Sequence, residues 1–272
     1  MERLTFGKNW PVGLFFFGLS LFILLPFISL LIWSVTKLWP WPNLFPDQLS
    51  LDSWNYLFSQ SGRGFEALYN SLVVAGITVI GNLLLGLPAA KILSQKQFFG
   101  KGFVFITLLS PLFIPLTVSV MGLHEITISF GFLPDFLSVA IAHILVTLPY
   151  FVAMVAYQFK LMGPKLQEAA MSLGASQRKV FWWVELPQLL PTILLACLFV
   201  IIISLSQYLP TWIMSGGTLL TLPLVIFPFA SSGNASIVSA YSIWFFVPVM
   251  ILVLSYYLLS RLVWFGKKGR GG

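Results

Sequence analysis

The sequence predicts an all-α polytopic membrane protein with six transmembrane helices. Hydrophobic residues make up 58% of the 272 residues and charged residues only 8%, whereas soluble domains carry about 25% charged residues. A surface with so few charges must face lipid rather than water. Six stretches are apolar over the roughly 20 residues that a helix needs to cross the hydrocarbon core. They span residues 12–36, 70–93, 103–123, 136–158, 191–213 and 237–263.

The distribution of basic residues predicts the orientation of these spans. Of the 15 lysines and arginines, 13 fall on the same side of the predicted membrane. Only Lys37 and Arg63 fall on the opposite side. Loops rich in lysine and arginine stay in the cytoplasm, so we expect both termini to be cytoplasmic. The net positive charge of the chain thus reflects its membrane topology, and nucleic-acid binding is not expected. We expect a multi-pass protein of the bacterial inner (cytoplasmic) membrane.

The chain is expected to have three parts. Residues 1–65 hold an N-terminal transmembrane helix, too long for a cleavable signal peptide, and an outer-surface segment. In that segment Asp52 can cap a short amphipathic helix that includes Trp54. Residues 66–265 form a core with five transmembrane helices, and residues 266–272 form a basic cytoplasmic tail.

The longest polar connection, about residues 160–190, lies on the predicted cytoplasmic side between the fourth and fifth spans. Its sequence predicts two short helices separated by a break. Pro164 suits a first helical turn, and Gly174 can end that helix because glycine accepts a positive φ. Ser176 can cap the second helix, which we expect Pro187 to limit. Helices this short are marginal in water, so a partner or the rest of the chain must hold them.

The same connection contains a spaced motif. It consists of Glu168-Ala169-Ala170, then Gly174, Val184 and Leu186-Pro187. This pattern resembles the cytoplasmic EAA loop of type I binding-protein-dependent ABC importer permeases. That loop reads Glu-Ala-Ala, three residues, Gly, nine residues, Ile, one residue, Leu-Pro. The only departure here is valine in place of isoleucine, and the resemblance extends over about residues 66–260.

The resemblance implies a type I ABC importer permease fold and a permease subunit that forms half of a translocation pathway. The helix from Glu168 to Gly174 would be a coupling helix seated in a groove of an ATP-hydrolysing subunit. The implied partners are two cytoplasmic ATP-binding subunits, a second permease (a copy or a paralogue), a periplasmic or lipid-anchored substrate-binding protein, and membrane lipid.

We expect the chain itself to have no catalytic residues. A phosphate-binding loop needs Gly-x-x-x-x-Gly-Lys-Ser/Thr, and Gly100-Lys101 lacks both the first glycine and the hydroxyl residue. ATP would therefore be used by the partner subunit, and this chain would bind no cofactor. With only two histidines, we expect no metal site.

Polar side chains inside predicted spans are candidates for the translocation path, because such groups are costly in lipid. Asn82, His143 and Gln207 are the three candidates, and His143 and Gln207 are expected at a similar depth. The alternative is that they form hydrogen bonds between helices of the bundle. Gly76, Gly81 and Gly86 predict close helix packing, and we expect kinks at Pro88, Pro111, Pro115 and Pro210.

The substrate class is only weakly indicated. The run Ser206–Thr211, followed by Gly216-Gly217 and Thr221-Leu222-Pro223, is similar to permeases of the thiamine, iron, polyamine and sulfate group, and less similar to sugar permeases. The alternative function is a secondary transporter or channel driven by an ion gradient. Such proteins often carry acids inside their spans, and no acid lies clearly inside a predicted span here.

Overall fold

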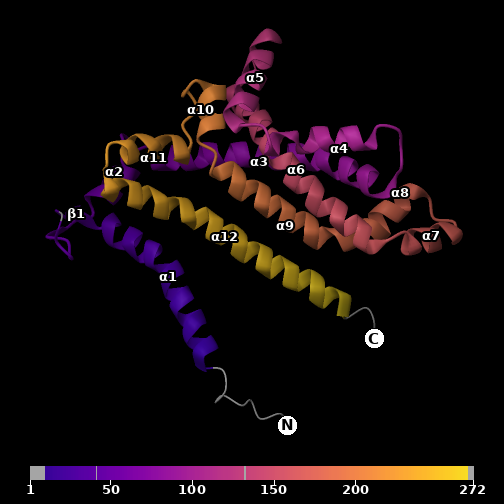
Figure 1. Ribbon diagram of the computed structural model, residues 1–272, viewed down its shortest axis with the longest axis horizontal. Coiled ribbons are helices and arrows are strands. Elements are labelled where there is room, and N and C mark those ends of the chain that lie inside the picture. The colour runs from indigo at the N-terminus through magenta and orange to yellow at the C-terminus, as the bar shows by residue number, and fades with distance from the viewer. Residues whose placement is uncertain (1–9, 41, 132, 269–272) are drawn as a thin grey trace. The chain divides into compact units, whose positions relative to one another are not determined.

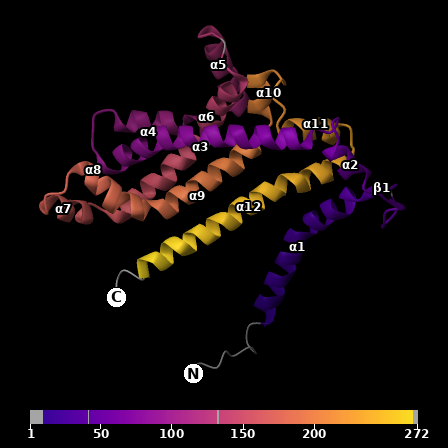
Figure 2. The same ribbon diagram turned by 180° about the vertical axis from the view of Figure 1, so that it is seen from behind.

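Helices account for most of the protein, which we describe from a computed structural model over residues 10–40, 42–131 and 133–268 (Figures 1 and 2). The α-helices are α1 (Trp10–Ser34), α2 (Asp52–Phe58), α3 (Gly64–Gln95), α4 (Lys101–Leu109), α5 (Leu116–Ser129), α6 (Asp135–Met162), α7 (Lys165–Ser172), α8 (Gln177–Val180), α9 (Leu186–Leu205), α10 (Leu209–Ser215), α11 (Leu222–Ser231) and α12 (Ala235–Lys268). The 3₁₀-helix η1 (Ser110–Leu112) follows α4, and the π-helix η2 (Phe181–Glu185) joins α8 to α9. The strands β1 (Thr36–Leu38) and β2 (Gln48–Leu49) pair antiparallel.

Over the described residues, five helical segments are long and apolar enough to cross a membrane. They are Val12–Ser34, Gly64–Gln95, Asp135–Met162, Gln177–Leu205 and Ala235–Leu258. A sixth exists if the bent pair of α4–η1 and α5 is one span. A mostly helical, multi-pass membrane protein is therefore confirmed, and the count of six spans and the side on which each terminus lies stay predictions. Part of that prediction rests on Arg3, Lys8 and Arg270, which lie outside the described residues.

The third predicted span, residues 103–123, is not one straight helix. The segments Lys101–Leu112 and Leu116–Ser129 meet at a bend of 108°. Pro111 lies in η1, and Pro115 has an extended backbone directly before α5. Because proline lacks an N–H group and disfavours a helical residue before it, these two prolines interrupt the helix. The kinks predicted here are confirmed, and whether the bent pair forms one span stays a prediction.

The fifth predicted span, residues 191–213, also has different bounds. The helical path runs from Gln177 to Leu205 and passes through Pro187 without ending. Beyond Leu205 the chain leaves the helix, and α10 begins as a separate short helix with Pro210 in its first turn. Pro210 has no N–H to donate to the carbonyl of Ser206. This missing hydrogen bond favours an end of α9 before this position.

The chain divides into two compact units, residues 1–64 with 226–246 and residues 65–225 with 247–272. The first unit therefore includes residues 226–246, which were predicted to lie in the core. In this unit the hydroxyl of buried Tyr241 donates to the carbonyl of Gly62, and the Tyr241 ring stacks on Phe229. A Cβ atom at Gly62 would lie 1.9 Å from the carbonyl oxygen of Tyr56. Only glycine is therefore accommodated at this turn.

The short helix predicted after residue 50 is α2, but Asp52 is not its cap. Leu51 occupies the N-cap position without a side-chain hydrogen bond. The hydroxyl of Ser50 instead accepts the Asp52 N–H at 2.9 Å. The Asp52 carboxylate lies 3.7 Å from the Lys37 ammonium, and both side chains are exposed. Serine takes the capping role here because it lies two residues before the first free N–H group.

In the second unit α3, α6 and α9 lie side by side and enclose an apolar core (Figures 1 and 2). Its fully buried members include Ala90 of α3, Phe151 and Val155 of α6, and Leu189 and Ala196 of α9. A second cluster packs α10 and α5 against the first half of α6. Its buried residues are Val74, Val120, Val139, Ala140, Ala142, Met214 and Leu219.

Two glycines bring α3 close to α6, as the sequence predicted. A Cβ atom at Gly81 would lie 2.2 Å from Ile144 Cδ1, and one at Gly86 would lie 2.5 Å from Phe151 Cδ1. The third glycine, Gly76, has no neighbour within 4 Å of its Cβ position. The packing prediction is thus confirmed for two of the three glycines.

We expect Gly86→Val to destabilise the protein by about 1–3 kcal/mol, the usual cost of overpacking a filled core. The ring of Phe151 is only 1% exposed and has no space to move into. Thermal unfolding of the detergent-solubilised protein measures the loss. Gly76→Val is the matched control on the same helix, and an equal loss in both variants would contradict the packing explanation.

Candidate functional site

The motif predicted as a coupling loop forms α7, a tight turn, α8 and η2. Over its length α7 has no buried residue, and Glu168 and Ala169 are both exposed. Leu173, directly after the helix, is 90% exposed. A large apolar side chain held in water at the end of a short helix is unfavourable unless a partner covers it. The segment thus has the features of a docking surface.

The turn after α7 is built as the sequence predicted. Gly174 has φ of +86°, a conformation that glycine adopts without steric cost. Its N–H donates to the carbonyl of Met171 at 2.9 Å, and the N–H of Ala175 donates to that of Ala170 at 3.1 Å. These bonds pair carbonyls that the end of the helix leaves free. The hydroxyl of Ser176 then caps α8.

The exit of the segment differs from the prediction that Pro187 limits the second helix. Between α8 and α9 the chain makes one π-helical turn, in which the N–H of Leu186 donates to the carbonyl of Phe181, five residues earlier. Proline has no N–H for the usual partner, the carbonyl of Trp183. The wider turn accommodates the missing hydrogen bond, so the helical path continues into α9. Of the motif residues here, Leu186 is half-buried and Pro187 is exposed.

A buried ion pair joins this exit to α3. The Nζ atom of Lys91 lies 2.5 Å from Oε2 of Glu185, and their side chains are 31% and 3% exposed. Lys91 also lies over the ring of Phe181, 4.9 Å from its centroid, and Gln95 donates to Oε1 of Glu185 at 3.5 Å. The acid is therefore enclosed by one cation and one amide from α3.

Sequence reasoning missed this pair. Lys91 was counted only among the basic residues that set orientation, and Glu185 only as a variable position of the motif. One signal was present in the sequence. Glu185 is an acid between apolar residues on a helix, and Lys91 is a cation near the end of a predicted span. Two isolated charges of opposite sign in such surroundings favour a pair.

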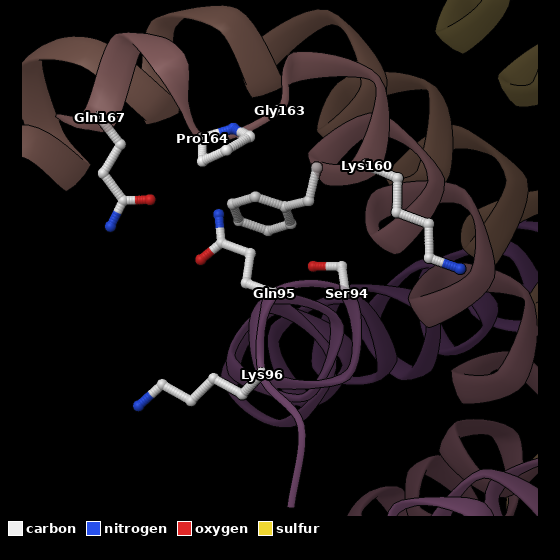
Figure 3. Close-up of a pocket in the computed structure, with 8 residues that line it drawn as sticks. Ser94, Gln95, Lys96, Lys160, Gly163, Pro164 and Gln167 are labelled. Atoms are coloured by element: carbon white, nitrogen blue, oxygen red, sulfur yellow. The ribbon is translucent and has the colours of Figure 1, made fainter. Parts of the chain in front are cut away.

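The entry of the segment is packed more loosely than its exit. A hollow of about 410 Å³ lies between the last turn of α3, the end of α6 and the start of α7 (Figure 3). Figure 3 shows Gln95 of α3 and Gln167 of α7 bordering this space. Its lining consists of Ser94, Gln95, Lys96, Phe159, Lys160, Gly163, Pro164 and Gln167. The first turn of α7 is thus not packed against α3.

Of the three polar residues predicted for the translocation path, Asn82 and His143 are buried inside helices, whereas Gln207 lies between two helices. His143 is 1% exposed, with Nδ1 at 2.8 Å from Ser204 Oγ and Nε2 at 3.1 Å from Thr211 Oγ1. The Thr211 hydroxyl donates to the carbonyl of Gln207, so it accepts from His143. We therefore assign the proton of the ring to Nε2.

Asn82 of α3 lies against Thr147, which is one turn along α6 from His143. It is fully buried, and its Nδ2 donates to Thr147 Oγ1 at 2.8 Å. The hydroxyl of Thr147 in turn donates to the carbonyl of His143 at 2.7 Å. The Oδ1 atom of Asn82 is buried without a hydrogen-bond partner in the described part of the chain. Asn82 and His143 are thus linked through one threonine.

The prediction that Gln207 lies inside a span is wrong. Gln207 lies between α9 and α10 and is half-buried. Its backbone reaches the group around His143, because its carbonyl accepts from Thr211 and its N–H donates to the carbonyl of Ser204 at 3.3 Å. The end of α9 at Leu205, earlier than predicted, explains the difference.

The curated relatives described below are permease proteins of transport systems. No protein-family model matches the chain. It is 34% identical over 129 residues to the molybdate/tungstate transport system permease protein WtpB of Pyrococcus abyssi, which covers 47% of this chain and 51% of the relative. The chain thus spans about half the length of that relative.

Two other relatives align over more of their length. The arabinooligosaccharides transport system permease protein AraQ of Bacillus subtilis is 26% identical, over 94% of each chain. The spermidine/putrescine transport system permease protein PotC of Haemophilus influenzae is 28% identical, over 78% of this chain and 81% of the relative.

One solved structure shares the fold over nearly the full length. It is a chain of the bacterial alginate ABC transporter in complex with an alginate pentasaccharide-bound periplasmic protein. The TM-score is 0.69 at 18% identity, over 96% of this chain and 98% of the other. At this identity the likeness concerns the fold alone.

Proposed function

We propose that this chain, which is homologous to the permease subunits of ABC transport systems, forms half of a substrate pathway and couples it to a separate ATP-hydrolysing subunit. The observation that carries the proposal is the exposed α7 with its turn, from Glu168 to Gly174. This surface ends in the uncovered side chain of Leu173. Its small residues, Ala169 and Ala170, permit close approach of a partner.

The proposed complex contains two permeases, two ATP-binding subunits and one substrate-binding protein in a bacterial inner membrane. The alginate transporter that shares this fold was solved in complex with a periplasmic protein, which supports a binding-protein partner here. Closure of the two ATP-binding subunits would move the coupling segments together, and this movement would switch the pathway between its two open states. ATP hydrolysis would take place on the partner subunits.

The substrate proposal stays broad. The named substrates of the relatives include spermidine and putrescine, arabinooligosaccharides, and molybdate or tungstate. Polyamine belongs to the group that the sequence favours, and the tetrahedral oxyanions molybdate and tungstate are chemically close to sulfate. The oligosaccharide relative supports a sugar equally, so we propose a small solute delivered by the binding protein.

We propose further that Asn82 and His143 lie beside the pathway, with Gln207 at its edge. Their burial within one subunit also suits the alternative, hydrogen bonding inside the bundle. Replacing each of the three by alanine distinguishes these roles. A pathway role predicts reduced transport at wild-type expression and thermal stability, whereas a bundle role predicts a loss of stability first. Unchanged transport in all three variants would refute the pathway role.

Co-purification tests the proposed function directly. Tagged protein is extracted from its source membrane in a mild detergent, and the co-eluting chains are identified by mass spectrometry. We expect an ATP-binding subunit with a phosphate-binding loop in the wild-type sample, and its loss when Glu168 and Leu173 are both replaced by lysine. If no such subunit appears in several detergents, the coupling role is wrong and a gradient-driven transporter becomes the better explanation.

A further inference from the structure

The exit of the coupling segment, which runs from α7 to η2, is packed against the transmembrane core. At its exit Val180 is 1% exposed and Glu185 is 2% exposed, and Glu185 is paired with Lys91 at 2.5 Å. At its entry the chain turns at Gly163, with φ of +61°, beside the hollow of Figure 3. The exit therefore provides a path of side-chain contacts by which a force on α7 reaches α3.

The ion pair is the strongest of the contacts at this exit. Glu185 is almost fully enclosed, and the described structure gives its carboxylate two side-chain partners, Lys91 and Gln95. Both belong to the last turns of α3. Separation of a buried carboxylate from its only cation is strongly unfavourable. The exit of the segment and the end of α3 are therefore expected to move together rather than apart.

The helix α3 connects this pair to the opposite end of the unit. Between Asn70 and Lys91 it is one helix, which corresponds to a length of about 31 Å at about 1.5 Å per residue. At its far end Asn70 Nδ2 donates to the carbonyl of Leu220 at 2.8 Å. The N–H of Leu222 donates to Ser71 Oγ at 2.9 Å. The segment after α10 is thus held directly by α3.

We propose that Lys91 and Glu185 are positioning residues that transmit the displacement of the coupling segment to α3 and, through α3, to residues 220–222. The proposal rests on the proposed function, because it requires an ATP-binding subunit that moves α7. It assigns the transmission of movement to the ion pair of Lys91 and Glu185. The motif resemblance, in contrast, concerns only the docking surface formed by α7 and its turn. Neither residue contacts substrate or nucleotide in this role.

The first test measures coupling in the reconstituted complex. Glu185→Gln keeps the shape of the side chain and removes its charge, so it should still fold and still bind the ATP-binding subunit. We expect the amount of substrate transported per ATP hydrolysed to fall at least about fivefold, the lower end of usual allosteric coupling. The charge swap Lys91→Glu with Glu185→Lys should restore most of this ratio, and Lys91→Arg should retain it.

Lys96→Glu is the matched control, because it reverses a charge five residues further along the chain at an exposed position. It should leave the ratio unchanged. A wild-type ratio of transported substrate to hydrolysed ATP in Glu185→Gln would overturn this inference but not the proposed function. A charge-swap variant that folds but has the same low ratio as Glu185→Gln would do the same. Absence of an ATP-binding subunit from the wild-type complex would overturn the proposed function as well, so the two failures are distinguishable.

The second test measures movement at the far end of α3. The native Cys197 is first replaced by alanine, and Leu220→Cys then provides a label site on a partly exposed residue. We expect the labelling rate of this cysteine to change on addition of ATP and vanadate. The change should disappear in Glu185→Gln and return in the charge swap. A change that persists unaltered in Glu185→Gln would refute transmission through the pair.

Discussion

Replacing Gly174 by valine is expected to release the ATP-binding subunit from the permease. The residue sits at φ of +86° in the turn after α7, where a side chain costs roughly 1–2 kcal/mol of backbone strain and a β-branched one is a true outlier. The turn would relax and displace Leu173, the exposed apolar group of the docking surface. Loss of one central interface anchor typically costs about 2 kcal/mol or more, which is at least a tenfold loss of affinity.

Two further variants separate strain from contact. Gly100 has φ of +83° and, like Gly174, no atom within 4 Å of its Cβ position, so Gly100→Val imposes similar strain outside the docking surface. It should retain the ATP-binding subunit. Gly174→Asn accepts the left-handed backbone, and its loss of binding would show that the partner approaches too closely for any side chain. Retention of the subunit by Gly174→Val, measured by co-purification, would contradict the docking role.

Lys91→Met is expected to be the most destabilising single change in the core, at about 3–5 kcal/mol, because it leaves a buried carboxylate without its cation. Glu185 is the less exposed partner, at 3% against 31% for the lysine side chain. Replacing Glu185 is therefore expected to lower the free energy of unfolding less than replacing Lys91, since the unpaired ammonium of Lys91 can still reach water. We expect Glu185→Gln to cost clearly less than Lys91→Met in thermal or SDS-induced unfolding of the solubilised protein.

The double variant Lys91→Met with Glu185→Met provides the control. Replacing both members of a buried ion pair by apolar residues of similar size is often neutral or stabilising. We therefore expect the double variant to recover most of the stability lost in Lys91→Met. Its ratio of transported substrate to hydrolysed ATP should stay low. Equal losses in both single variants would show that burial of the acid does not set the cost.

The helical architecture was predictable because lipid imposes one dominant rule, a run of apolar residues of fixed length. That rule locates helices such as α3 and α6, but it contains no information on how a helix is bent or divided. The 108° bend lies at Pro111 and Pro115, and α9 ends a few residues before Pro210. Proline marks such positions in the sequence, yet Pro187 and Pro88 lie within continuous helical paths, so proline alone does not decide the outcome.

The candidate site was predictable where local chemistry decides its shape. The turn at Gly174 follows from the conformational freedom of glycine and from the cap at Ser176. The pair of Lys91 and Glu185 could not be derived with the same certainty, because the two residues are 94 positions apart and meet only after α3 has packed on α9. Gln207 was misplaced for the related reason that its distance from the membrane surface depends on where α9 ends.

The helix α1 has a consequence for how freely its sequence can vary. The apolar window of this span has no buried residue, and within it the ring of Phe27 contacts the ring of Phe246. Selection within this chain can therefore act on the average hydropathy and length of α1 but hardly on the shape of its side chains. Leucine, isoleucine and phenylalanine should exchange freely over most of its turns during evolution, whereas the buried face of α6 should retain residues of fixed volume.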